Sequence, residues 1–211
     1  MKKIVSLLLG VMICFIVSNL SGCRLMSSTT SRKTLEKIEL PEENLKDAGN
    51  WTFPVLLNAK NNNLGDKVEL KQLWKDPKIK LVMVTFWATW GEPCNVELTY
   101  INDIFLHYQN KGLMVLAISL DKDEKLKPVI IKCITGMKWK KDTAGHQGGD
   151  LVNITYPILL DTNNTSKEIY GIGAIPVTFL VNKNNKIVYQ HSGCSEKLIE
   201  DLKEKIGELL P

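Results

Sequence analysis

The sequence predicts an α/β domain in which helices flank a central mixed β-sheet. Two runs, 79–87 and 113–120, are almost continuous in apolar and β-branched residues, which is typical of strands buried on both faces. Apolar residues at helical spacing follow each run, and the chain ends with two short strands and an amphipathic helix. Strands that alternate with helices indicate parallel pairing with right-handed crossovers, whereas the final strand pair must be antiparallel.

The domain begins with a predicted β-hairpin. Residues 51–57 form an extended, mostly apolar stretch, and 68–70 follows after a turn rich in asparagine and glycine. The run 79–87 comes next. It should be a central strand, because a strand that is apolar on both faces needs cover on both sides.

The middle of the domain is predicted to alternate between helix and strand. Apolar residues recur at intervals of three and four from Leu98 to Tyr108, so a helix should start after Cys94 and end near Gly112. The elements expected after it are a strand at 113–120, a helix at 124–134, a polar insertion at 136–153 and an extended stretch at 155–160.

The end of the chain differs in character. Strands at 177–181 and 187–190 are joined by the turn 183–186, whose asparagines tolerate positive φ angles. A last helix is expected to cover the sheet with one apolar face, made of Leu198, Leu202, Ile206 and Leu209.

The N-terminus has the features of a secretory signal. Lys2 and Lys3 precede the apolar run 4–17, which is shorter than the roughly 20 apolar residues that a membrane-spanning helix needs. Leu20-Ser21-Gly22-Cys23 then resembles the lipobox of bacterial lipoproteins, in which the cysteine is acylated. We therefore expect a signal peptide at 1–22, lipidation at Cys23, and a position in the bacterial cell envelope, membrane-anchored and facing the extracytoplasmic side.

A polar segment separates this signal from the domain. We expect 23–49 to be a flexible tether, since it is rich in serine, threonine and charge, and 50–211 to be one domain. The 27 basic and 23 acidic residues nearly balance, which argues against a nucleic-acid partner. The only arginines, Arg24 and Arg32, lie in the tether, so the domain has no guanidinium for anion recognition.

The motif Phe86-Trp87-Ala88-Thr89-Trp90 leads to Pro93-Cys94 and Glu97, and Gly171-Ile172-Gly173-Ala174-Ile175-Pro176 follows some eighty residues on. Together with the order of elements, these residues closely resemble the bacterial envelope thioredoxin-like reductases of the TlpA/ResA kind, over about 50–211. The resemblance implies a thioredoxin-like fold in which a two-cysteine motif starts a helix. It also implies a cis peptide bond before Pro176, with Ile175 contacting the substrate.

This chain departs from the family at the decisive position. Gly91 stands where the attacking cysteine belongs, and Cys94 matches only the resolving cysteine. Thr85 occupies the place where thioredoxins proper carry a buried acid. Exchange between two thiols within the motif is therefore excluded, and the motif is a degenerate CXXC.

The first hypothesis is a protein- or peptide-binding module without redox chemistry, in which Cys94 is a buried and inert thiol. Its partner would be an envelope protein or peptide, including one that contains cysteine. The expected substrate groove consists of Trp90, Gly91, Glu92, Pro93, Ile175, Pro176 and Gly193.

The alternative keeps thiol–disulfide oxidoreductase activity. Because Gly91 has no side chain, Cys94 could be uncovered and act as a monothiol, although Glu92 and Glu97 would raise its pKa. Alternatively, Cys194 could form a distant pair with Cys94 across the groove. The mature chain retains three cysteines, Cys94, Cys133 and Cys194, so at least one thiol should be free.

Other chemistries are disfavoured. A thiol peroxidase would need a threonine at position 91 and an arginine in the domain. His191 and Cys194 have the spacing of a metal-chelating pair, but two ligands do not close a site, so we expect no metal and no cofactor. His107 and His146 are expected on the surface. Cys133 is expected at the far end of the domain from the motif.

Overall fold

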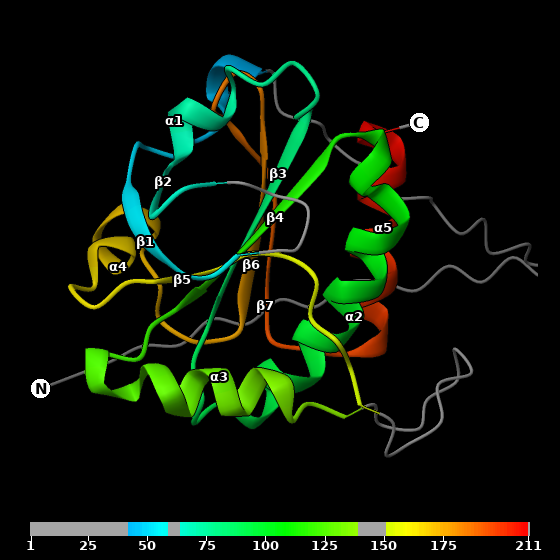
Figure 1. The fold of residues 1–211 in the computed structure, drawn as a ribbon. Coiled ribbons are helices and arrows are strands. Elements are labelled where there is room, and N and C mark those ends of the chain that lie inside the picture. The colour runs from blue at the N-terminus through cyan, green and yellow to red at the C-terminus, as the bar shows by residue number, and fades with distance from the viewer. Residues whose placement is uncertain (1–41, 59–63, 139–150, 211) are drawn as a thin grey trace, which may run out of the picture. The chain divides into compact units, whose positions relative to one another are not determined.

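The computed structural model describes residues 42–58, 64–138 and 151–210, which form the predicted α/β domain around one mixed sheet (Figure 1). In chain order the elements are η1 (Glu42–Asn44), β1 (Thr52–Leu57), β2 (Lys67–Glu69), α1 (Leu70–Leu73), β3 (Leu81–Trp87), α2 (Glu92–Tyr108), η2 (Gln109–Lys111), β4 (Leu113–Ser119), η3 (Glu124–Leu126), α3 (Lys127–Thr135), β5 (Ile158–Leu160), α4 (Thr165–Tyr170), β6 (Val177–Asn182), β7 (Ile187–Ser192) and α5 (Glu196–Leu209).

The sheet has the strand order β2-β1-β5-β4-β3-β6-β7. As predicted, β3, β4 and β5 are parallel, while β6 and β7 form an antiparallel hairpin beside β3. All seven residues of β3 and of β4 are buried, in agreement with their continuous apolar sequences. The N-terminal hairpin also joins this sheet, because β1 pairs antiparallel with β5.

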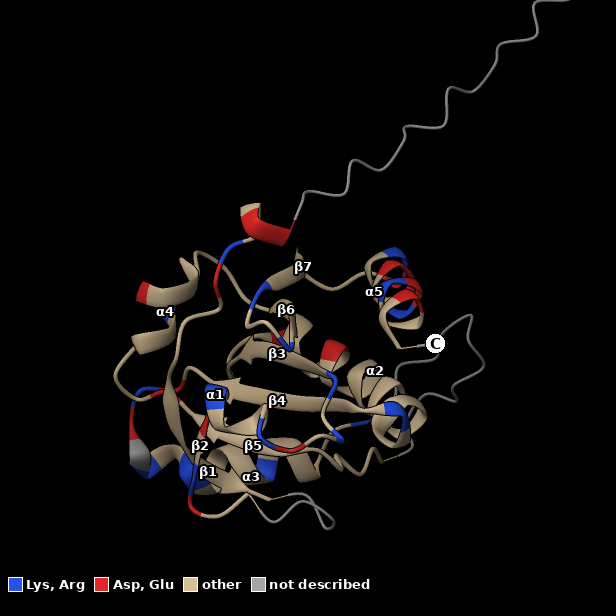
Figure 2. Cartoon of the chain, turned by 90° about the horizontal axis from the view of Figure 1, so that it is seen from above, with Lys and Arg blue, Asp and Glu red and all other residues tan. Residues whose placement is uncertain are grey.

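Helices cover both faces of the sheet (Figure 1). One core contains apolar residues of α2, α3 and α5, among them Leu98, Ile130 and Leu202. The other contains residues of α1 and α4 and the inward side of the N-terminal hairpin, among them Leu70 and Tyr170. Acidic and basic residues are interspersed along α5 (Figure 2).

Two short helices, α1 and α4, were not predicted. Helix α4 has only six residues, too few for a helical apolar period. A buried carboxylate fixes its start instead: Asp161 accepts hydrogen bonds from the backbone N–H groups of Thr165 and Ser166 at 3.0 and 2.8 Å.

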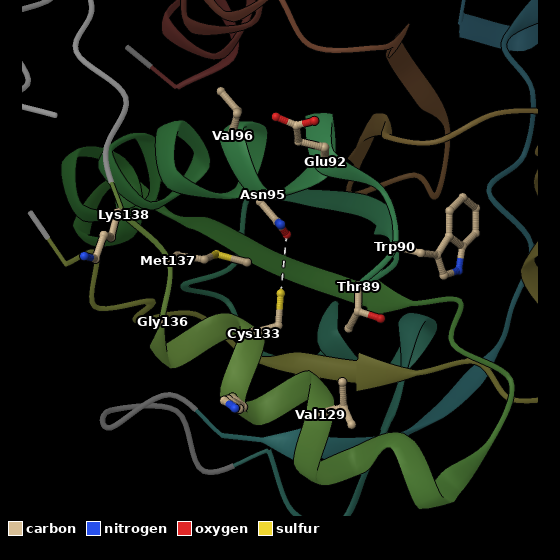
Figure 3. Close-up of a pocket in the computed structure, with 11 residues that line it drawn as sticks. Thr89, Trp90, Glu92, Asn95, Val96, Val129, Cys133, Gly136, Met137 and Lys138 are labelled. Carbon is tan, nitrogen blue, oxygen red and sulfur yellow. Dashed lines mark hydrogen bonds between the residues drawn. The ribbon is translucent and has the colours of Figure 1, made fainter. Parts of the chain in front are cut away.

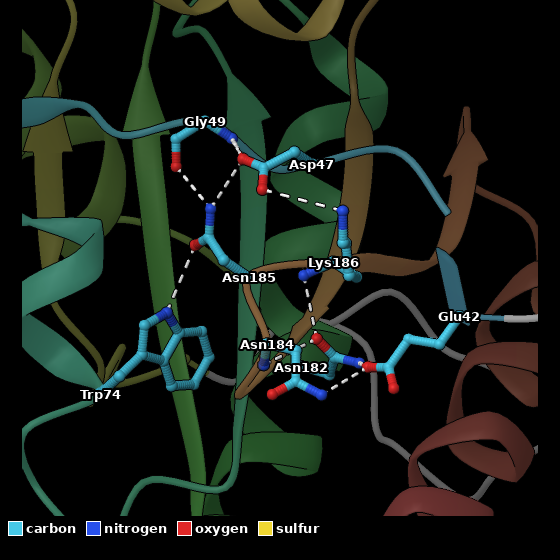
Figure 4. A network of polar contacts seen from close by, with 8 residues as sticks. All are labelled: Glu42, Asp47, Gly49, Trp74, Asn182, Asn184, Asn185 and Lys186. Carbon is cyan, nitrogen blue, oxygen red and sulfur yellow. Dashed lines mark hydrogen bonds and ion pairs between the residues drawn. The ribbon is translucent and has the colours of Figure 1, made fainter. Parts of the chain in front are cut away.

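The segment before residue 50 packs on the domain, so ordered structure begins earlier than the predicted tether boundary (Figure 4). Ala48 is fully buried. The side-chain amide of Asn185, in the β6–β7 turn, donates to Asp47 Oδ1 and to the carbonyl of Gly49. The side chains of Asn182, at the end of β6, and Asn184, in the turn, donate to Glu42 and lower the pKa of its carboxyl group.

The predicted signal peptide, Cys23 and residues 24–41 lie outside the described residues, as do His146 and most of the insertion at 136–153. Within the described part of the chain, every helix is too short or too polar to cross a membrane.

Candidate functional site

The motif Trp90-Gly91-Glu92-Pro93-Cys94 lies at the junction of β3 and α2. Gly91 precedes the helix with extended backbone angles, and Pro93 occupies its first turn, where a missing N–H group costs no hydrogen bond. The N–H of Gly91 donates to the carbonyl of Ala88, and the N–H of Cys94 donates to that of Gly91. The helix therefore starts at the position that the resemblance implies.

A buried aspartate fixes the loop that leads into the motif. Asp121, 3% exposed, follows the end of β4 and accepts hydrogen bonds from the N–H and the hydroxyl of Thr89 at 3.1 and 2.8 Å. The hydroxyl of Ser119 also donates to it at 2.7 Å. These bonds hold the motif against the ends of the parallel strands.

The loop before β6 forms the other side of the site. The Ile175–Pro176 peptide bond is cis, as expected. The N–H of Gly193, after β7, donates to the carbonyl of Pro176 at 2.8 Å. A Cβ atom built on Gly91 would lie 3.5 Å from Cδ1 of Ile175. Sequence segments about eighty residues apart are thus brought together at one place.

Cys94 is fully buried at this place, even though Gly91 has no side chain. Burial raises the pKa of the Cys94 thiol to about 11, and the nearby carboxylate of Glu97 adds to the rise. A reactive cysteine needs the opposite, a lowered pKa and access to solvent. The glycine therefore does not uncover the thiol as the monothiol hypothesis expected.

Ile175 helps to close the space above Cys94. The Cβ position at residue 91 would lie 2.7 Å from Sγ of Cys94 and 3.5 Å from both the carbonyl oxygen of Ala88 and Cδ1 of Ile175. The end of the Ile175 side chain therefore borders the position that a side chain at residue 91 would fill.

Ile175→Ala should expose the Cys94 thiol. Loss of the capping side chain opens the path through Gly91, so we expect iodoacetamide to alkylate Cys94 about tenfold faster or more, at fixed pH. Mass spectrometry of the digested protein assigns the label to each cysteine. Ile169→Ala, on α4, is the matched control and should leave the rate unchanged; an equal rate in both variants would refute the capping role.

Glu97 is the centre of a buried polar cluster behind Cys94. Its Oε1 lies 2.7 Å from Nε2 of His191 and accepts from the Thr178 hydroxyl at 3.1 Å. Its Oε2 accepts from the Thr85 hydroxyl at 3.4 Å. Glu97 is 0% exposed and His191 6%, so water contributes little to satisfying either group.

This cluster corrects the interpretation of two sequence positions. The expected loss of a buried acid at Thr85 is compensated in space, because Glu97 of α2 places a carboxylate beside the Thr85 hydroxyl. His191 pairs with this carboxylate through Nε2, and its Nδ1 has no hydrogen-bond partner among the described residues. The pairing was missed because Thr178 and His191 are more than eighty residues from Glu97 in sequence.

Cys133 is not at the far end of the domain, as predicted, but beside the motif (Figure 3). Its Sγ lies 3.5 Å from Oδ1 of Asn95, the residue after Cys94. The prediction was wrong because α3 crosses the face of the sheet next to the start of α2 rather than running away from it. Cys133 lines a pocket of about 620 Å³ together with Trp90, which is 71% exposed.

The remaining candidates have less support from the geometry. Cys94, Cys133 and Cys194 form no disulfide in the structure, and the distant Cys94–Cys194 pair stays a prediction. Among the described residues, no three histidine, cysteine, aspartate or glutamate side chains gather as a metal site would need. Trp87 is fully buried in the core, and His107 is exposed.

Comparisons with known proteins show which family the chain resembles. The model of the AhpC/TSA family matches residues 45–190. The thiol-disulfide oxidoreductase ResA of Oceanobacillus iheyensis is 30% identical over 152 residues, 64% of this chain and 70% of that protein. ResA of Bacillus anthracis is 31% identical over 70% of this chain and 71% of its own length. ResA of Bacillus cereus is 27% identical over 97% of both chains.

Solved structures confirm the thioredoxin-like fold. StoA from Bacillus subtilis superimposes with a TM-score of 0.51 at 21% identity, covering 74% of this chain and 97% of that one. The thioredoxin domain of a thiol-disulfide oxidoreductase from Bacteroides vulgatus gives a TM-score of 0.56 at 20% identity, covering 79% and 96%. At these identities the likeness concerns the fold alone.

Proposed function

Because the chain belongs to the AhpC/TSA family of thioredoxin-like proteins and is a relative of the ResA thiol–disulfide oxidoreductases, we propose that it is a protein- or peptide-binding module that has lost dithiol activity. The observation that carries this proposal is the state of Cys94. The thiol has no exposed surface, its pKa is raised to about 11, and Gly91 stands where its redox partner would be.

The binding part of the proposal is supported by what the site retains. The cis bond before Pro176, the contact of Gly193 with Pro176 and the exposed side chain of Trp90 are independent of a thiol at residue 91. Gly173 and Ala174, just before the cis bond, are exposed, so a peptide could meet them there. The groove can therefore accept a polypeptide segment without bonding to it covalently.

We further propose that the protein is held in the bacterial cell envelope, on the extracytoplasmic side, by acyl chains on Cys23. The lipobox-like sequence and the apolar run before it support this proposal. Several acyl chains on one residue would bind a membrane stably, since each buried methylene contributes about 0.8 kcal/mol. The partner would then be another protein or peptide of the envelope, including cysteine-containing ones.

The loss of dithiol activity is tested by insulin reduction with dithiothreitol as the electron donor, using the domain 42–211. We expect the wild-type domain to give no turnover above the uncatalysed rate, and the same result for Cys94→Ser. Turnover in the wild type that disappears in Cys94→Ser would contradict the proposal and favour the monothiol or the Cys94–Cys194 alternative.

A further inference from the structure

The pocket beside the motif shares Trp90 and Glu92 with the expected substrate groove, but its other walls do not come from the cis-proline loop. It lies between the start of α2 and the helix α3, and we call it the α2–α3 pocket (Figure 3). No residue of the loop 173–176 lines it, and neither does Gly193. Its volume of about 620 Å³ exceeds what a single amino-acid side chain fills.

Two exposed apolar residues line this pocket. Trp90 is 71% exposed and Val129 is 49% exposed, and both line it, while Met137, 4% exposed, forms a buried part of the wall. An exposed tryptophan beside a concave apolar surface is typical of protein-binding sites, where tryptophan often contributes much of the affinity. A small molecule held inside the pocket would leave most of the Trp90 side chain in water. A polypeptide could cover both the pocket and the Trp90 side chain.

The charges at the pocket restrict the partner further. Lys132 and Lys138 line it and are exposed, against one carboxylate, that of Glu92. Glu92 belongs to the first turn of α2, where the helix dipole favours a negative charge. Lys138 and Trp90 lie at opposite ends of the pocket (Figure 3). A partner segment that complements this pocket would have an apolar side chain toward Trp90 and an acidic side chain toward Lys138.

We propose that the α2–α3 pocket is a docking site for an extended segment of a partner protein that inserts an aliphatic or aromatic side chain next to an acidic residue. This inference rests on the proposed binding function and places part of the recognition outside the cis-proline groove. Cys133, half-buried in the wall, reports on occupancy because a bound segment covers its thiol.

The test uses two synthetic hexapeptides with a central phenylalanine, one flanked by aspartates and one by lysines. Amide chemical shifts of the ¹⁵N-labelled domain are followed up to millimolar peptide. We expect the acidic peptide to move the resonances of 129–138 and the Trp90 indole, and to slow alkylation of Cys133 by iodoacetamide at least about threefold. The basic peptide should bind at least about threefold more weakly, since exposed charge pairs contribute little each.

Val129→Asp provides the matched variant, with Ile131→Asp as control on the same helix. Val129 lines the pocket and Ile131, 39% exposed, does not. Val129→Asp should weaken the acidic peptide about fivefold or more, because it puts a carboxylate on the apolar wall, and Ile131→Asp should leave the affinity unchanged.

Two results would overturn this inference. Shifts confined to 173–176 and Gly193 would place the peptide in the groove, which refutes the pocket but keeps the proposed function. No shift and no protection of Cys133 with either peptide would also refute the pocket, whereas the proposed loss of dithiol activity is judged separately by the insulin assay.

Discussion

Gly91→Cys should form a disulfide with Cys94 and restore reductase activity. A Cβ atom at residue 91 would lie 2.7 Å from Sγ of Cys94. In a disulfide, the Cβ of one cysteine lies about 3 Å from the Sγ of the other, given the usual bond length of about 2.0 Å between the sulfurs. The backbone angles of Gly91, φ −91° and ψ 95°, suit any residue. The backbone is therefore already placed for the bond.

The measurement is a thiol count in denaturant on the domain 42–211. The wild type contains three thiols, Cys94, Cys133 and Cys194. After mild oxidation Gly91→Cys should show two, and after reduction four. Insulin reduction should exceed the wild-type rate on the order of 10²-fold or more, since loss of a nucleophile costs an enzyme several orders of magnitude.

Gly91→Ser is the matched control for this variant. A serine has nearly the same size as a cysteine, but it cannot form a disulfide with Cys94. Its Cβ must therefore push Sγ of Cys94 aside. It should stay inactive and keep three thiols. If Gly91→Cys retained four thiols under oxidation, the site would have lost more than a side chain, and the glycine at residue 91 would not account for the proposed loss of activity.

Glu97→Leu should lower the free energy of unfolding by about 3–5 kcal/mol, because it removes one partner of a buried ion or hydrogen-bond pair. The leucine nearly fills the volume of the glutamate, so no large cavity contributes. His191 Nε2 and the hydroxyls of Thr85 and Thr178 would lose their shared acceptor in the interior.

Urea denaturation of the wild type and of Glu97→Leu measures this loss of stability. Glu200→Leu, at an exposed position of α5, is the control and should change stability by less than about 0.5 kcal/mol. Glu97→Leu/His191→Leu should recover part of the loss, because it removes both members of the pair. Equal midpoints for Glu97→Leu and the control would show that the cluster does not stabilise the fold.

Much of the fold could be predicted because its signals are local. The apolar runs of β3 and β4, the helical period of α2 and α5, and the asparagine turn between β6 and β7 each lie within a short window of sequence. Asn185, in that turn, has the positive φ of 61° that its residue type tolerates. Elements too short to show a period, such as α1 and α4, were missed for the same reason.

The candidate site was only partly predictable. Two motifs in the right order were enough to expect Gly91, Cys94, Ile175 and Pro176 at one place. The position of Cys133 was predicted wrongly, because it depends on the direction in which α3 crosses the sheet. The Glu97–His191 pair was missed, since the pairing of β6 with β7 decides which residues face α2.

The sequence by itself determined that Gly91 replaces the first cysteine of a two-cysteine motif, and that exchange between two thiols there is excluded. Only the tertiary structure decided what became of the remaining cysteine. Exposure and pKa depend on atoms brought from distant parts of the chain. Cys94 is fully buried in the folded core, and this burial, with the carboxylate of Glu97 nearby, raises the pKa of the thiol rather than lowering it.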